Sequence, residues 1–179
     1  MNFRARRVSA HEWIQLRDAR LEALREAPDA FESKYAEERM KSDAEWQDRA
    51  LQSSGAEPRK DGLRVATFVL EQIGAGHWAG MATVLEEREA GRPQAQLVGV
   101  YVQPPHRSRR VGAAEALIRE TLDWACGDVG AQRVRLVVRE DNQRAIAFYR
   151  RLGFGETGWT FPYPPDPSLW ECEMEYRGA

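Results

Sequence analysis

The chain has 179 residues, which suits one folded domain rather than two. Its net charge of −2 argues against a surface built to bind nucleic acids or other polyanions. Hydrophobic residues make up 42% of the chain and support a packed core, but no apolar run approaches the ~20 residues that span a bilayer. We therefore expect a single domain over residues 1–179.

Neither a targeting signal nor a cysteine-based site is evident in the sequence. The basic N-terminal segment 1–7 is not followed by an apolar run, so no signal peptide is expected and the cytoplasm is the default location. Cys126 and Cys172 belong to no C-x-x-C pair or Cys/His cluster, so neither a metal site nor a disulfide framework is indicated. Cys126 is expected to be a small buried hydrophobic residue near a helix end.

The first third of the chain predicts a short strand and two helices. The strand is expected over residues 3–8. Ser9 and Glu12 match a capping box, and the helix behind them should end before Pro28 because proline disfavours helix in the preceding residue. A second capping box, in the segment 42–45, begins the next helix.

The middle of the chain predicts strands that pair with their sequence neighbours. A loop over 52–62 comes first, and a polar loop over 86–93 separates the second strand from the third. Short loops favour an antiparallel meander. The three predicted strands are 63–70, 78–85 and 95–102.

The last third of the chain alternates helices and strands. Its order favours a mixed sheet with helices on both faces. A strand over 154–160 is an optional addition. The remaining predicted elements are a helix over 111–125, a strand over 133–138, a helix from about 142 and a final strand over 169–176.

The most distinctive motif follows the apolar strand over 133–138. Residues 142–154 read N-x-x-A-x-x-F-Y-x-x-L-G-F, with apolar positions at helical spacing. Asn142, or the aspartate before it, is a suitable N-cap, and Gly153 is a natural helix stop. Asn142 and Tyr149 therefore aim at a site near the C-terminal end of the strand. An ordinary helix facing the core has the same spacing.

A basic loop opens the helix predicted from residue 111. Residues 103–113 read QPPHRSRRVGA and follow a strand. The unpaired N–H groups of a helix N-terminus carry partial positive charge and bind phosphate readily. Gly112 and Ala113 leave room for close backbone approach, and the arginines add charge. For any single arginine, a solvated basic loop is the alternative.

These two segments resemble motifs of the GNAT N-acetyltransferase superfamily. The strand end at residues 102–104 is similar to the family's V-x-P, and Arg107 and Gly112 match its pyrophosphate loop, R-x-x-G-x-G/A. Residues 142–154 resemble the family's last motif. The resemblance covers most of the chain, from residue 3 to residue 176.

The resemblance implies a GNAT-like α/β (α+β) fold with a mixed, mainly antiparallel central sheet and helices on both faces. It also implies that the strand ending at Val102 splays from the next strand, which leaves backbone groups near Val100 and Val102 for pantetheine. Arg110 departs from the family's first loop glycine. Its side chain must point outward, or the loop path must shift and redirect an arginine to a phosphate.

Acetyl coenzyme A is the donor that the resemblance implies, with direct transfer of the acetyl group to an amine. An amine acceptor is the expected partner, without nucleic acid or membrane, and a homodimer stays an open alternative. The residues assigned to the coenzyme are Val100, Tyr101, Val102, Arg107, Ser108, Arg109, Arg110, Val111, Gly112, Ala113, Asn142, Ala145, Phe148 and Tyr149.

The catalytic groups follow from the chemistry of amine attack on a thioester. A base must remove the amine's proton, and an acid can protonate the leaving thiolate. Tyr149 matches the position of the family's acid, with a core tyrosine as the alternative. A backbone N–H near Val100 is expected to meet the oxyanion. Glu86 is favoured as the base because it ends a central strand; Glu37, Glu38 and Glu71 are the other candidates.

The acceptor pocket in this family is usually shaped by the connection between the first two helices and by the final loop. Both segments are rich in aromatic residues here, and aromatic faces with an aspartate suit a cationic amine. Packing of these aromatics against the sheet end is the alternative. The acceptor candidates are Phe31, Tyr35, Trp159, Phe161 and Asp166.

Two other functional classes are compatible with the sequence. The first is a sensor that binds coenzyme A without turnover, which Arg110 makes conceivable. The second is nucleic-acid binding through the arginines of the loop, which the net charge opposes. The sequence does not identify the acceptor amine.

Overall fold

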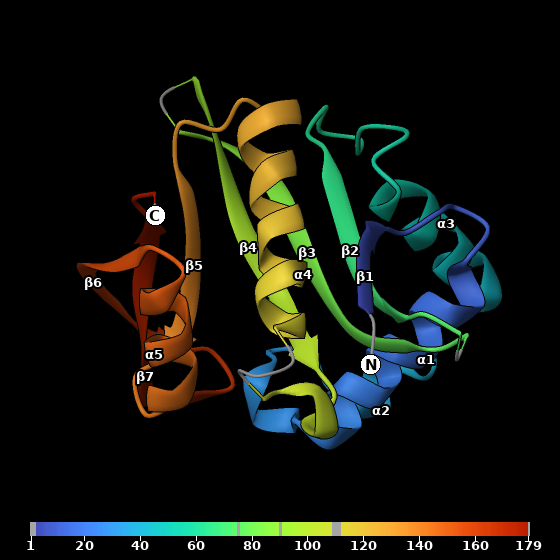
Figure 1. Ribbon diagram of the computed structural model, residues 1–179, viewed down its shortest axis with the longest axis horizontal. Coiled ribbons are helices and arrows are strands. Elements are labelled where there is room, and N and C mark those ends of the chain that lie inside the picture. The colour runs from blue at the N-terminus through green and yellow to red at the C-terminus, as the bar shows by residue number, and fades with distance from the viewer. Residues whose placement is uncertain (1–2, 75, 90, 109–111, 179) are drawn as a thin grey trace.

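The computed structural model describes residues 3–74, 76–89, 91–108 and 112–178, which form a seven-stranded sheet with helices on both faces (Figure 1). The strands are β1 (Phe3–Arg7), β2 (Val65–Gln72), β3 (Trp78–Glu89), β4 (Arg92–Val102), β5 (Val134–Arg139), β6 (Phe154–Tyr163) and β7 (Asp166–Tyr176). The helices are α1 (Trp13–Glu26), α2 (Tyr35–Glu38), α3 (Asp43–Ser53), α4 (Ala113–Asp123) and α5 (Gln143–Arg151).

The strand order is β1-β2-β3-β4-β5-β7-β6, and every neighbouring pair is antiparallel except β4 with β5. This confirms the mixed, mainly antiparallel sheet expected from the sequence. The optional strand after the last helix is present as β6 and forms an edge of the sheet. No described helix is long and apolar enough to cross a membrane.

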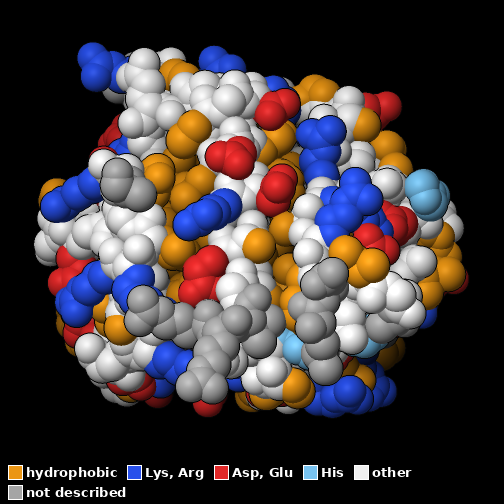
Figure 2. All heavy atoms as spheres, viewed as in Figure 1, with side chains coloured by type: hydrophobic (Ala, Val, Ile, Leu, Met, Phe, Trp, Pro, Cys, Tyr) orange, Lys and Arg blue, Asp and Glu red, His pale blue; other side chains and the backbone are white. Residues whose placement is uncertain are grey.

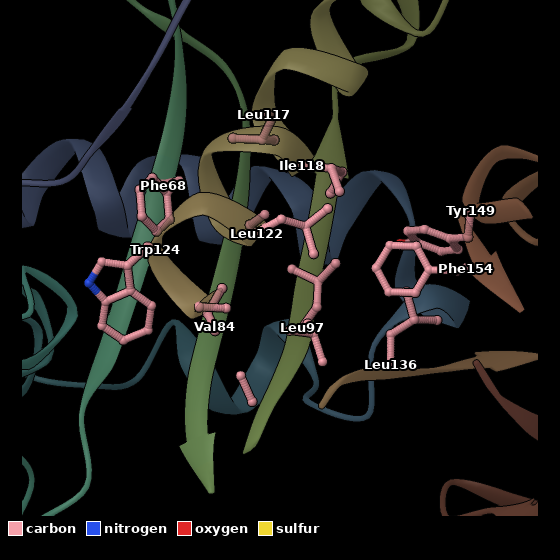
Figure 3. Packing of buried hydrophobic residues seen from close by; sticks show 14 of the residues in the cluster. Phe68, Val84, Leu97, Leu117, Ile118, Leu122, Trp124, Leu136, Tyr149 and Phe154 are labelled. Atoms are coloured by element: carbon pink, nitrogen blue, oxygen red, sulfur yellow. The ribbon is translucent and has the colours of Figure 1, made fainter. Parts of the chain in front are cut away.

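Each face of the sheet carries its own apolar core. On one face, α4 and α5 cover a cluster that joins Ile118 and Leu122 of α4 to Val84 and Leu97 of the sheet, with Leu122 drawn nearest to the two sheet residues (Figure 3). On the other face, the first helices bury a second cluster that includes Leu16. Figure 1 shows α4 crossing the front of the sheet while α1, α2 and α3 lie behind it. The sheet therefore separates two layers of helices.

The two predicted capping boxes had different outcomes. Ser42 and Glu45 form a complete box at the start of α3, as predicted. The prediction at Ser9 was wrong, since α1 begins only at Trp13 and has no side-chain cap. The Glu12 carboxylate still accepts the Ser9 N–H at 2.7 Å, but the chain makes a turn there first.

Two further expectations are corrected. The predicted polar loop over 86–93 is mostly strand, because β3 and β4 continue to a tight hairpin in which Glu89 pairs with Arg92. Cys126 is exposed rather than buried. A π-helical turn, Trp124–Asp128, follows α4 and directs Trp124 and Ala125 into the core, which leaves the cysteine outside.

Candidate active site

The parallel strands β4 and β5 pair over only two residues and then separate. Ala95 pairs with Val134 and Gln96 with Arg135, but β4 continues to Val102 without a further partner on β5. We call the opening beyond these pairs the strand split. It is present as the resemblance implied.

A bulge in β4 lies at the strand split. Two steps along β3, from Met81 to Thr83, oppose three steps along β4, from Val98 to Tyr101. Gly99 sits within the bulge with φ of 62°, a conformation that favours glycine. An extra residue bends and twists a strand locally. The bulge therefore helps to direct β4 away from β5.

The N-terminus of α4 lies just beyond the C-terminal end of β4 (Figure 1). Gly112 is its N-cap with φ of 65°, and no side chain of the described residues caps the helix. The first bond within the helix joins the Ala116 N–H to the Gly112 carbonyl at 3.0 Å. A Cβ at Gly112 would meet no atom within 4 Å. The described residues thus give the first-turn N–H groups of α4 no side-chain partner, and such groups can bind a phosphate.

In the loop before α4, Arg107 is engaged by groups of the protein itself. The Arg107 guanidinium donates to the Val102 carbonyl at 2.6 Å and to the Glu26 carboxylate. It is thereby held against α1, and its side chain would have to leave these partners to reach a phosphate. Ser108 is exposed in the connection to α4. Arg109, Arg110 and Val111 lie outside the described residues.

The three β4 residues assigned to the coenzyme lie in different surroundings. Val100 has no register partner on β3 and lies beyond the last pair with β5. Tyr101 faces the α1 layer, where its hydroxyl donates to Glu22 at 3.4 Å and burial raises its pKa to about 12. The Val102 carbonyl is already bonded to Arg107. Val100 is therefore the best placed of the three.

Helix α5 brings Asn142 and Tyr149 to the same side of the split. The Asn142 side chain accepts the Ala145 N–H at 3.1 Å and caps the helix. Tyr149 is buried between Phe148 and Phe154, with ring centroids at 5.3 and 5.7 Å. Figure 3 shows its ring reaching from α5 towards α4 and β4. Burial raises the pKa of Tyr149, so the phenol is protonated at neutral pH.

Hydrophobic side chains form an apolar strip on the outer surface beside α4. Figure 2 shows hydrophobic side chains along one flank of α4, between that helix and the part of the molecule formed by β5, α5 and β7. Partly buried side chains that contribute to this face include Val100, Ala114, Ala145 and Phe148. The strip and the α4 N-terminus lie on the same face of the sheet, and they offer apolar contacts and backbone N–H donors respectively.

The opposite face of the sheet has a cavity of about 560 Å³. It reaches the strand split, since Val98 and Gly99 of β4 and Val137 of β5 line it. We call it the acceptor-side cavity. Its other lining residues are Leu16, Arg20, Ala30, Phe31, Glu32, Ser33, Arg49, Gln52, Ser53, Arg59, Val65, Thr67, Met81, Thr83, Leu85, Gln96, Leu97, Tyr163 and Glu171.

Glu171 of β7 is a titratable group in this cavity that sequence reasoning missed. Burial raises its pKa, the nearby Glu32 raises it further, and Arg139 opposes the shift. A carboxylate with a raised pKa in a cavity is a candidate general base. The signal was in the sequence, because Glu171, Glu173 and Glu175 alternate along one face of the final strand.

The structure argues against Glu86, which the sequence favoured as the base. Glu86 pairs with Ala95 at the closed end of β4, away from the split. Its carboxylate accepts the Arg64 backbone N–H at 3.1 Å and side-chain Nε at 3.0 Å. It is a structural ion pair. The cavity lining does not include the other candidates Glu37, Glu38 and Glu71.

Of the five acceptor candidates, only Phe31 lines the cavity. Trp159 and Phe161 point to solvent from the edge strand β6, with exposed fractions of 67% and 41%. Asp166 accepts from Ser168 in the β6–β7 hairpin, and Tyr35 packs beside the second core. The final loop instead supplies Tyr163, whose hydroxyl donates to the Phe31 carbonyl at 3.0 Å.

The sequence matches known families and proteins over part of its length. It matches the model of the acetyltransferase (GNAT) family over residues 20–154. It is 34% identical over 116 residues to N-acetyltransferase family 8 member 2 of Rattus norvegicus, covering 63% of this chain and 50% of that protein. It is 42% identical over 59 residues to N-alpha-acetyltransferase RimI of Mycobacterium tuberculosis, covering 33% of this chain and 34% of that protein. The chain spans about half the length of these relatives or less.

Solved structures share the fold at low sequence identity. PaiA N-acetyltransferase of Thermoplasma acidophilum, in complex with coenzyme A, has a TM-score of 0.66 at 18% identity, covering 98% of this chain and all of that one. NAA60 of Arabidopsis thaliana, in complex with a bisubstrate analogue, has a TM-score of 0.65 at 15% identity. The match covers 99% of this chain and all of that one. These matches confirm the fold expected from the sequence.

Proposed function

Since the chain belongs to the acetyltransferase (GNAT) family, we propose that it is an N-acetyltransferase with acetyl coenzyme A as donor and a primary amine as acceptor. The observation that carries this proposal is the strand split. On one face of the sheet, the α4 N-terminus and the apolar strip lie beside the split. On the other face, the acceptor-side cavity reaches the split. Two substrates can thus meet from opposite sides of the sheet.

The donor fits the residues of the α4 and α5 face. The first-turn N–H groups behind Gly112 suit the pyrophosphate, since no described side chain caps them. Val100 and the apolar strip suit the pantetheine arm. Structural neighbours solved in complex with coenzyme A or a bisubstrate analogue support this assignment.

The reaction needs proton transfers that two side chains at the split can perform. The thioester supplies an activated acyl carbon. Attack by the neutral amine forms the C–N bond and breaks the C–S bond, while the amine's proton leaves to a base and the thiolate takes up a proton. Glu171 is the proposed base, on the cavity side. Tyr149 is the proposed donor to the thiolate, on the opposite side.

Thermal unfolding and thiol release together test this function. Acetyl coenzyme A at about 100 times its dissociation constant should stabilise the fold by about 2.7 kcal/mol, and thiol should appear with at least one member of an amine panel. Pantetheine without phosphates should stabilise much less, since it cannot use the α4 N-terminus. A melt unchanged by millimolar acetyl coenzyme A contradicts the donor assignment. If acetyl coenzyme A stabilises the fold but no amine causes the release of free thiol, the protein is a coenzyme A sensor instead.

A further inference from the structure

Arg20 of α1 is a buried cation without a hydrogen-bond acceptor in the described structure. The residue is only 6% exposed and lines the acceptor-side cavity. Its Nε has no partner. The nearest carboxylate oxygen, Oε1 of Glu38, lies 3.7 Å from Nη2, which is too far for a hydrogen bond. A buried guanidinium with unused donors is costly, so this part of the cavity lacks an anionic or polar partner.

The charges around Arg20 do not balance. Glu38 is the one carboxylate that pairs with Arg20 in the described residues, and it is shared with Lys41 at 3.0 Å and Arg49 at 2.7 Å. Three cations therefore surround a single anion. Burial, followed by the charge of Arg49, lowers the pKa of Arg20 to about 10. Since Arg49 also lines the cavity, this wall carries excess positive charge.

The position of Arg20 ties this charge to the site of transfer. A Cβ on Gly99 would lie 3.7 Å from Nη1 of Arg20, so the guanidinium sits beside the β4 bulge at the strand split. The Phe31 ring lies 4.8 Å from the guanidinium carbon and fixes its orientation from the other side. An anion bound by Arg20 would thus be close to the amine that reacts at the split.

We propose that the acceptor is a free α-amino acid whose carboxylate binds Arg20 while its amino group faces the split. The inference rests on the proposed function and names its substrate class. One carbon separates the amine from the carboxylate in such a molecule, so a carboxylate on Arg20 would keep the amine near the β4 bulge. The 560 Å³ cavity leaves room for a side chain. A polyamine suits this wall poorly, because it would add positive charge to an unbalanced cluster.

The first test uses the unmodified protein and a panel of amino acids. The best substrate is compared with its α-amide, which keeps the amine and side chain but loses the carboxylate, and with a dipeptide that begins with the same residue. Charge-assisted hydrogen bonds imply a preference for the free acid of about tenfold to hundredfold in kcat/KM, mainly through KM. The amine of the amide is less basic than that of the free acid, so more of the amide is in the neutral, reactive form. This difference favours the amide and therefore opposes the predicted preference for the acid.

The second test removes the guanidinium. Arg20→Met should abolish the preference, so that acid and amide have similar kcat/KM, while coenzyme A affinity is unchanged. Arg17→Met is the matched control on the same helix, since Arg17 pairs with Asp18 at the surface and does not line the cavity. It should keep the preference. If Arg20→Met does not fold, the comparison of acid with amide on the unmodified protein still tests whether a carboxylate on the acceptor is recognised.

Opposite results overturn the inference. Equal or better use of the amide, of the dipeptide or of a polyamine by the unmodified protein would show that the cation cluster is structural. Retention of the acid preference in Arg20→Met would do the same. These outcomes leave the proposed function intact. Failure of the function itself would look different, with no amine acetylated and no stabilisation by acetyl coenzyme A.

Discussion

The two faces of the strand split are built from different chemistry. The donor face uses backbone groups, at the α4 N-terminus and along β4, with apolar side chains between them. The acceptor face uses charged side chains such as Arg20, Arg49 and Glu171 around a cavity. Backbone sites tolerate many side chains, whereas a side-chain cavity changes with each substitution. Under the proposed function, the donor face can thus stay constant while the acceptor face sets the substrate.

The largest expected effect comes from the acceptor face. Glu171→Gln should lower kcat by ~10² to 10⁴-fold if Glu171 is the general base. Its raised pKa predicts that wild-type activity falls as the pH drops through a value above the ordinary ~4.3 of glutamate, since only the carboxylate accepts a proton. The kcat profile against pH measures this. The Glu171→Gln variant should not show this fall of kcat at low pH.

Glu175→Gln is the control for this change. Glu175 lies on the same face of β7, two ladder positions beyond Glu173, and pairs with Arg133 outside the cavity. It should keep normal kcat. Loss of activity in both variants, or in neither, would remove Glu171 from the mechanism and with it the contrast between the two faces.

A smaller effect is expected from Tyr149 on the donor face. Tyr149→Phe should lower kcat at least tenfold and leave coenzyme A affinity nearly unchanged, because the ring still packs against Phe154 and only the hydroxyl is lost. The raised pKa predicts no loss of the proton donor at neutral pH. Steady-state kinetics at saturating coenzyme measure it. Turnover within twofold of wild type would leave water as the proton source.

The smallest effect tests whether the α4 N-terminus holds phosphates through its backbone. Gly112→Asp should weaken coenzyme A binding about tenfold relative to Gly112→Asn, because a carboxylate opposes an anion at a helix N-terminus. Both residues tolerate the positive φ of 65° comparably, so backbone strain cancels in the comparison. Calorimetric affinities measure it. Equal affinities would place the phosphates elsewhere.

The local features of the donor face could be predicted from contiguous sequence. Asn142 caps α5, and Gly153 follows its end with φ of 93°. Gly112 opens α4 in the expected place. These positions are decided by hydrogen bonds and dihedral angles within a few residues. Caps and turns of this kind depend little on the rest of the chain.

The acceptor face could not be predicted in the same way. The sequence favours Glu86 because it predicts a strand end there, but β3 continues to Glu89, and the Glu86 carboxylate forms a structural ion pair with Arg64. Trp159 and Phe161 satisfied a compositional argument yet face solvent. No local pattern says which face of an edge strand is covered, since that depends on the elements packed against it.

The sequence by itself determined the family and the order of the strands and the longer helices, because these rest on motif spacing, local propensity and backbone geometry. The four-residue helix α2 was not predicted. Only the tertiary structure decided which side chains enter the cavity. Arg20 from α1, Val98 from β4 and Glu171 from β7 meet there across most of the chain's length. Their meeting depends on strand register and on the bulge at Gly99. Those features are set by long-range pairing, which a linear pattern does not record.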